Sequence, residues 1–227
     1  MNQKEIYWAQ IFASAKHGHS LWDGNATNGT DPSLAYKTAI EFCNHASHLG
    51  FFKDDNKVLD LGCGNGRFAT VLSENKIKYI GLDPHKESIE FCQNAFAVYP
   101  NVKFQLMDVW NEIFNTTGSV KAEHYVFPFE DNYFNDIIVY SVFTHLQTLD
   151  AAKNYMKEIR RVLKPGGKLF CTWYRSPPNK ITDYCGRTCY EEKEIMNMIT
   201  GLTFDFTYGG HNDQYYDQWG LFCTKPL

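Results

Sequence analysis

A short apolar run leads directly into a glycine-rich turn at Val58-Leu59-Asp60-Leu61-Gly62-Cys63-Gly64-Asn65-Gly66-Arg67-Phe68. Glycine has no Cβ, so the three glycines let the backbone turn sharply and come close to a ligand. The helical pattern after the turn would aim its free N–H groups at that ligand. The stretch therefore predicts a strand, a ligand-binding turn and a helix, which is a unit of α/β proteins.

The glycine spacing indicates which ligand the turn accepts. A dinucleotide-binding turn would need glycines at positions 62, 64 and 67, but position 67 is Arg and the third glycine is Gly66. An arginine at the point where helix must pack closely on strand disfavours a bound pyrophosphate. A nicotinamide-dependent dehydrogenase is therefore the weaker interpretation.

From residue 57 onward, apolar runs of strand length alternate with helical patterns, as in a parallel α/β sheet. Strands are expected over 57–61, 78–82, 102–106, 136–140, 168–174, 203–208 and 219–224, and helices over 33–49, 67–75, 86–98, 150–163 and 191–199. Residues 109–130 show no clear periodicity. Because loops of this length in compact domains tend to be functional, we expect a cover over a site there.

Two acidic residues follow strands at positions that suit a nucleoside. Asp83 ends the second expected strand, 21 residues beyond Gly62, where a carboxylate can accept both ribose hydroxyls. The alternative is an N-cap for the helix at Lys86, but the glycine turn favours the ribose role. Asp108 ends the third strand and could accept from an exocyclic amine of adenine, although turns favour Asp in any case.

Together these residues resemble the class I S-adenosylmethionine-dependent methyltransferases, over roughly residues 33–175. The family pattern D-x-G-x-G-x-G corresponds to Asp60–Gly66, followed by acidic residues after strands two and three. Two further segments resemble its small-molecule (type 11) branch: 127–136, which reads FPFEDNYFND, and 158–169, which contains LKPGGKL. The chain departs from the pattern at 109–126, where extra residues separate Asp108 from the first of these segments.

The resemblance implies a Rossmann-like, doubly wound sheet of seven strands, in the order 3-2-1-4-5-7-6 with one antiparallel strand. It also implies S-adenosylmethionine as cofactor and S-adenosylhomocysteine as product. The residues expected to bind the cofactor are Asp60, Gly62, Cys63, Gly64, Gly66, Asp83, Pro84, Asp108, Val109, Tyr140 and Ser141.

Methyl transfer to a hydroxyl or a protonated amine requires removal of a proton. Ligands on such sheets lie at the carboxyl ends of the strands, which directs attention to the residues after the fourth strand. His145 is the candidate general base, because imidazole titrates near neutral pH, and a structural role for it stays open. The residues expected to line an acceptor pocket are His19, Trp22, Phe143, Thr144, Tyr174 and His211. No metal is expected, because Thr144 stands where a related branch has Glu beside the histidine.

The composition narrows the class of partner. The chain has 227 residues, 22 Lys plus Arg against 26 Asp plus Glu, and a formal net charge of −4, which disfavours binding to a nucleic-acid backbone. No apolar run is long enough to span a membrane, and seven scattered cysteines fit a reduced, cytoplasmic protein. We expect a polar N-terminal segment over 1–32, which could cover the active site, and a methyltransferase domain over 33–227 with its core motifs in 58–174. The expected acceptor is a small molecule methylated on O or N. A protein or RNA acceptor, a non-catalytic cofactor-binding module, and a monomer or homodimer all stay open.

Overall fold

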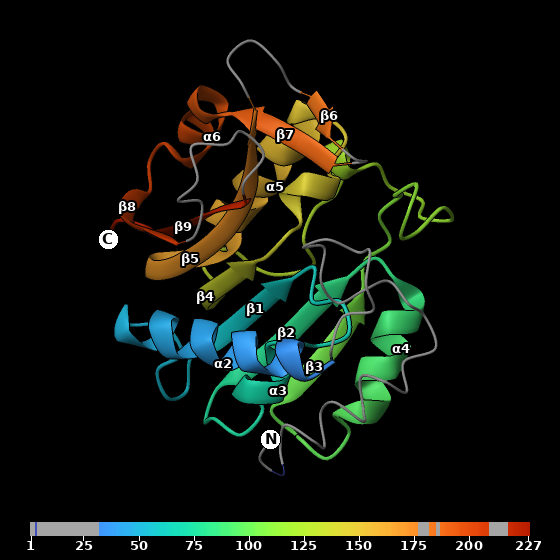
Figure 1. Cartoon of the computed structure of the whole chain (residues 1–227), viewed down its shortest axis with the longest axis vertical. Coiled ribbons are helices and arrows are strands. Elements are labelled where there is room, and N and C mark those ends of the chain that lie inside the picture. The colour runs from blue at the N-terminus through green and yellow to red at the C-terminus, as the bar shows by residue number, and fades with distance from the viewer. Residues whose placement is uncertain (1–2, 4–31, 177–181, 185–186, 209–217) are drawn as a thin grey trace. The chain divides into compact units, whose positions relative to one another are not determined.

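The computed structural model describes residue 3 and residues 32–176, 182–184, 187–208 and 218–227 (Figure 1). The chain divides into two compact units, Met1–Met107 and Asp108–Leu227, which we call unit 1 and unit 2. Most of the N-terminal segment expected over 1–32 lies outside the described residues. Three of the residues expected to line an acceptor pocket also lie outside them: His19, Trp22 and His211.

Unit 1 contains three parallel strands in the order β3-β2-β1: β1 (Lys57–Leu61), β2 (Lys78–Asp83) and β3 (Val102–Leu106). Leu61 pairs with Leu82 and Asp83 pairs with Leu106, so the three strands end at a common edge. Four of the five β1 residues are buried, as expected for a parallel strand covered on both faces.

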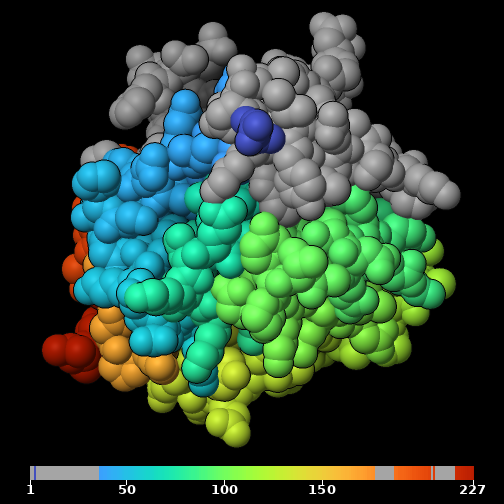
Figure 2. Space-filling view, turned by 90° about the horizontal axis from the view of Figure 1, so that it is seen from below, coloured from blue at the N-terminus to red at the C-terminus, as the bar shows by residue number. Residues whose placement is uncertain are grey.

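Three helices cover this sheet: α2 (Pro32–His48), α3 (Ala69–Leu72) and α4 (Lys86–Ala95). Helix α2 packs on the residues that lead into α3, where the rings of Phe42 and Phe68 lie 4.8 Å apart. Helix α4 packs beside β3 through Phe96 and Phe104, whose rings are 5.3 Å apart. Both α2 and α4 lie at the surface of unit 1 (Figure 2).

Unit 2 is built on β5 (Leu163–Ser176), which pairs in parallel with β4 (Phe134–Val139) and antiparallel with β9 (Gln218–Thr224). Strand β9 pairs antiparallel with β8 (Thr203–Tyr208), so this part of the order is β4-β5-β9-β8. The hairpin of β6 (Thr182–Tyr184) and β7 (Arg187–Glu191) joins the end of β5, where Arg175 pairs with Tyr190.

Helices α5 (Leu149–Val162) and α6 (Glu192–Ile199) pack on the strands of unit 2, and two short 3₁₀ helices, η1 (Ala122–His124) and η2 (Phe143–His145), precede α5. Thr148 caps α5 by accepting the Ala151 N–H at 3.1 Å. Arg161, in the last turn of α5, donates to the carbonyls of Phe127 and Phe129. These bonds attach the segment before β4 to α5. They give residues 127–131 a structural role in unit 2.

The structure agrees with the expected strands and corrects the elements between them. The helix expected over 67–75 comprises only Ala69–Leu72, because the preceding residues form tighter turns such as Gly66 N–H to Cys63 O. Strand β5 begins earlier than expected, at Leu163, and its pairing with β4 shifts register across the glycines that follow. The hairpin β6–β7 was not expected. Among the described residues, no helix combines the length and apolar character needed to cross a membrane.

Candidate active site

The glycine turn of unit 1 has the conformation that its glycines allow. Gly62, Gly64 and Gly66 have φ angles of +74°, +51° and +81°, in the left-handed region that side chains disfavour. The Gly62 N–H continues the sheet by donating to Leu82 O at 2.7 Å. A Cβ on Gly66 would lie 2.8 Å from the Phe96 ring, so α4 can approach this turn only because position 66 is glycine.

Asp83 connects the glycine turn to the start of α4. Its Oδ2 accepts the Gly64 N–H at 2.8 Å and its Oδ1 accepts the His85 N–H at 2.8 Å. The N-cap residue of α4 is His85, so Asp83 closes the turn before the helix and does not cap it. A carboxylate oxygen has about two lone-pair positions, so the bond from Gly64 or from His85 does not by itself saturate either oxygen.

Asp60 lies inside unit 1 and is 1% exposed. The hydroxyl of Tyr79 donates to its Oδ2 at 2.5 Å. Burial raises the pKa of Asp60 to about 7, although the Tyr79 hydrogen bond and the charge of Arg67 act in the opposite direction. Asp60 therefore joins β1 to β2 two residues before Gly62, through a carboxyl group that changes charge near neutral pH.

In unit 2, the chain leaves β4 through a strained residue. Ser141 has φ +60° although it carries a side chain, a conformation that costs on the order of 1–3 kcal/mol. Its N–H donates to the Thr172 hydroxyl at 2.7 Å, and its own hydroxyl accepts from the Gln218 amide at 2.5 Å. Strain that is held in place by neighbouring strands is a frequent property of functional turns.

The 3₁₀ turn η2 follows directly and is packed from the side of β5 and β7. The ring of Phe143 stacks on the ring of Trp173 with centroids 3.7 Å apart. The ring of Tyr190 packs edge-on against the same Trp173 ring, with centroids 5.3 Å apart. Phe143 and Thr144, expected to line an acceptor pocket, are 0% and 1% exposed in the interior of unit 2. Here they support the turn, and their contact with an acceptor stays a prediction.

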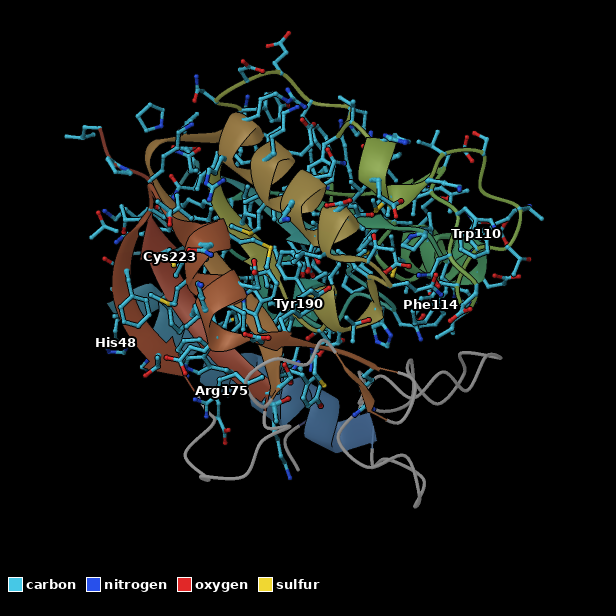
Figure 3. The ribbon with its side chains drawn as sticks, turned by 90° about the horizontal axis from the view of Figure 1, so that it is seen from above. His48, Trp110, Phe114, Arg175, Tyr190 and Cys223 are labelled. Atoms are coloured by element: carbon cyan, nitrogen blue, oxygen red, sulfur yellow. The ribbon has the colours of Figure 1, made fainter. Side chains whose placement is uncertain are left out.

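His145, the last residue of η2, is half-buried beneath the segment that follows Asp108. The ring of Phe114 meets the imidazole edge-on, with centroids 5.0 Å apart. The side-chain amide of Asn111 donates to the His145 carbonyl at 3.2 Å. Figure 3 labels Phe114 and Trp110, which both belong to this segment. Trp110 is 41% exposed. The expected cover therefore contacts the candidate base within unit 2.

The remaining expected residues of unit 2 have different surroundings. The exposed carboxylate of Asp108 accepts hydrogen bonds from the N–H and the hydroxyl of Ser119. Val109 is buried, Tyr140 packs near Phe170, and the hydroxyl of Tyr174 accepts from Arg187 at 3.2 Å. Among the described residues, no three His, Cys, Asp or Glu side chains gather closely enough to hold a metal ion.

Comparison with known protein families decides the identity of this fold. A family model described as a methyltransferase domain matches residues 59–171, which contain the glycine turn, Asp83, Asp108 and the turn after β4. The chain belongs to the class I S-adenosylmethionine-dependent methyltransferases. Its cofactor is S-adenosylmethionine.

Curated relatives agree with this family. An uncharacterised methyltransferase of Schizosaccharomyces pombe is 31% identical over 63% of this chain and 50% of its own length. A ubiquinone/menaquinone biosynthesis C-methyltransferase of Wigglesworthia glossinidia brevipalpis is 27% identical over 91% of this chain and 76% of its own length. The chain thus spans about half the length of the first of these relatives. Further matches include a "probable tRNA methyltransferase" of Mus musculus, so the relatives' names do not share one acceptor class.

Solved structures confirm the fold class expected from the sequence. The crystal structure of a methyltransferase from Methanosarcina mazei has a TM-score of 0.60 with this chain, at 17% identity. The alignment covers 80% of this chain and 97% of that one. The fold is therefore the Rossmann-like α/β fold of this methyltransferase family, and the two expected halves of the strand order, 3-2-1 and 4-5-7-6, are those of unit 1 and of β4-β5-β9-β8.

The glycine turn of this methyltransferase fits the cofactor. Among the described residues, no atom lies within 4 Å of a Cβ built on Gly64, so this part of the chain leaves space open beside the Asp83 carboxylate. Glycine backbone beside an aspartate side chain suits a nucleoside, because hydroxyl groups can donate to the acid while the chain approaches the ligand closely. Sequence reasoning missed three residues that support expected site residues of unit 2, because none belongs to a recognisable motif. They are Tyr190 at the turn after β4, Gln218 at Ser141 and Ser119 at Asp108.

Proposed function

We propose that this chain transfers the methyl group of S-adenosylmethionine to an oxygen or nitrogen atom of a small-molecule acceptor. The observation that carries the proposal is the glycine turn, in which no described residue fills the space beside Gly64 while its N–H donates to Asp83. The cofactor supplies a methyl group already activated by a sulfonium charge. The protein therefore has to bind the acceptor, align it with this methyl group and remove a proton from its nucleophilic atom.

In this proposal, Asp83 accepts the ribose hydroxyls and Asp108 accepts the exocyclic amine of adenine. Asp60 lies in β1 directly before the turn, and its hydrogen bond from Tyr79 joins β1 to β2 there. The other residues assigned to cofactor binding keep that role as part of the proposal: Gly62, Cys63, Gly64, Gly66, Pro84, Val109, Tyr140 and Ser141.

On the acceptor side, His145 takes the proton from the nucleophilic atom. Its place supports this role, because the imidazole ends a turn that Tyr190 and Asn111 hold through backbone carbonyls. The ring of Phe114 lies against the imidazole and keeps water from that edge. A base carried by a turn with a fixed backbone and partly shielded from water is well placed for general base catalysis.

The charge of the chain supports a small acceptor over RNA. The formal net charge of −4 gives no overall attraction for a phosphate backbone. The competing functions are methylation of protein or RNA and cofactor binding without catalysis. Each predicts a different methylated product, or none.

The first experiment measures thermal unfolding with S-adenosylmethionine, S-adenosylhomocysteine and NAD. A ligand at 100 times its dissociation constant adds about 2.7 kcal/mol to the unfolding free energy, which raises the midpoint by several degrees. We expect both adenosyl compounds to stabilise the protein and NAD to have no effect. Asp83→Ala should weaken S-adenosylhomocysteine by about 1–3 kcal/mol. No response to either adenosyl compound would reject the cofactor site.

The second experiment identifies the acceptor class with methyl-labelled S-adenosylmethionine. Separate pools of metabolites, RNA and protein are incubated with the enzyme, with Asp83→Ala as the cofactor-deficient control. Label in the metabolite pool that depends on Asp83 supports the proposal. Label in RNA or protein selects the corresponding alternative, and strong cofactor binding without label in any pool supports the non-catalytic module.

A further inference from the structure

Asp108 is an exposed carboxylate with both oxygens engaged by one residue. The backbone N–H of Ser119 donates to Oδ1 at 2.9 Å, and the Ser119 hydroxyl donates to Oδ2. These bonds to an ionised acceptor are stronger than neutral ones and fix the plane of the carboxylate. They also lower the pKa of Asp108, which keeps the group ionised.

Ser119 is delivered to this position by a closed loop. Val109 and Val120 form a parallel bridge, in which Trp110 N–H donates to Val120 O at 2.7 Å and Val120 N–H donates to Asp108 O at 3.3 Å. A Cβ on Gly118 would lie 2.3 Å from the carbonyl carbon and oxygen of Val109. The loop can therefore close only with glycine at position 118, directly before Ser119.

The two bonds leave room for a ligand. An ionised carboxylate offers about four lone-pair positions, and Ser119 occupies one on each oxygen. The remaining positions are presented at a fixed angle on an exposed residue, so an incoming N–H donor meets an acceptor whose rotation is already restricted.

We propose that Ser119 is a positioning residue, which orients the Asp108 carboxylate toward the exocyclic amine of the adenine ring. This inference rests on the role assigned to Asp108 in the proposed function. It assigns to the inserted loop a part in selecting the purine, in addition to its contact with His145.

The test compares two ligands that differ at the purine 6-position. S-adenosylhomocysteine carries an amine there, and S-inosylhomocysteine carries a carbonyl oxygen that cannot donate to Asp108. Titration calorimetry on the full chain gives both dissociation constants for wild type, Ser119→Ala, Asp108→Asn and the double variant. Thr117→Ala is the matched control, because the Thr117 hydroxyl lies in the same loop but donates to Asn115.

We expect Ser119→Ala to weaken S-adenosylhomocysteine about 5- to 10-fold, as for the loss of one charge-assisted hydrogen bond. S-inosylhomocysteine should change less than about 2-fold, so the adenosyl-to-inosyl preference falls. Thr117→Ala should keep the wild-type preference, and Ser119→Thr should restore it. In the double variant, removing Ser119 should cause no further loss of preference beyond Asp108→Asn.

The outcomes separate this inference from the proposed function. An equal loss for both ligands in Ser119→Ala, or no loss, would overturn the positioning role while leaving the cofactor site intact. If Asp108→Asn left the preference unchanged, the amine would not be read by Asp108 and the inference would fall with that assignment. If wild type bound neither ligand, the proposed cofactor function itself would be rejected.

Discussion

The hydroxyl of Tyr190 is shared between two carbonyl oxygens of the turn after β4, at 2.9 Å from Phe143 O and 3.0 Å from Leu146 O. Tyr190 belongs to the hairpin β6–β7, so a separate structural element fixes the turn that carries His145. Tyr190 itself is 0% exposed, and burial raises the pKa of its hydroxyl, which keeps it a donor.

Tyr190→Phe should therefore lower the unfolding free energy by about 1–3 kcal/mol, because buried carbonyls lose their donor. Urea unfolding measures this change, with Tyr99→Phe on unit 1 as a control of similar chemistry. Methyl transfer should fall while S-adenosylhomocysteine affinity stays within about 2-fold, since the cofactor residues are untouched. A wild-type midpoint would contradict the support that we assign to Tyr190.

Gly64 and Gly66 should respond differently to alanine. At Gly64 the new methyl meets no atom of the described part of the chain, so Gly64→Ala should lower stability through its positive φ, by about 1–2 kcal/mol. It should weaken S-adenosylhomocysteine at least about tenfold, because the methyl enters the space proposed for the ligand. Gly66→Ala should destabilise more, because its methyl meets the Phe96 ring at 2.8 Å. Thermal unfolding with calorimetry checks both, and unimpaired binding by Gly64→Ala would move the ligand elsewhere.

Asp60 should make stability depend on pH. Its folded pKa of about 7 lies above its unfolded value of 3.8, so the protonated form is favoured by folding. The stabilising contribution is complete below pH 3.8 and is lost as the pH rises through about 7. Urea unfolding at pH 5 and pH 8 should show lower stability at pH 8.

Asp60→Asn should remove this part of the pH dependence, because an amide does not titrate. Asp54→Asn is the control, since Asp54 is a 70% exposed carboxylate of the same unit. If Asp60→Asn kept the wild-type difference between pH 5 and pH 8, another group would be responsible.

His145→Ala should slow methyl transfer by about 10²–10⁴-fold, once an acceptor is known, if the imidazole removes a proton. Cofactor affinity should stay near wild type. His124→Ala, at an exposed histidine of the same unit, should keep full activity. Initial rates across pH 5–9 provide the measurement. Full activity in His145→Ala, together with a lower unfolding midpoint, would assign His145 a structural role.

Most strands could be predicted because each is an apolar run with polar or turn-forming residues at both ends. Strands β1, β3 and β8 have the expected bounds because each is a short apolar or alternating run with clear breaks on both sides. The hairpin β6–β7 has no such signal, since TDY and RTCYE are short and mix polar with aromatic residues. Its pairing with β5 is a long-range interaction that local pattern does not encode.

The candidate site was predictable at its strand ends and less so between them. Asp83 and the glycine turn follow from residue type and spacing, because strand ends are where a parallel sheet presents ligands. Two other features arise from tertiary packing: the burial of Phe143 against Trp173, and the engagement of Asp108 by a serine eleven residues away. No spacing rule indicates them.

The hydrogen bond from Gly64 to Asp83 has a consequence for evolution. One carboxylate joins the turn after β1 to the start of α4, so selection for a correctly folded chain is enough to retain it. A descendant protein that no longer methylated its acceptor molecule would still retain Asp83 and Gly64. The presence of this pair in a related protein therefore indicates that the fold is retained. Evidence for catalysis has to come from His145 and the loop that contacts it.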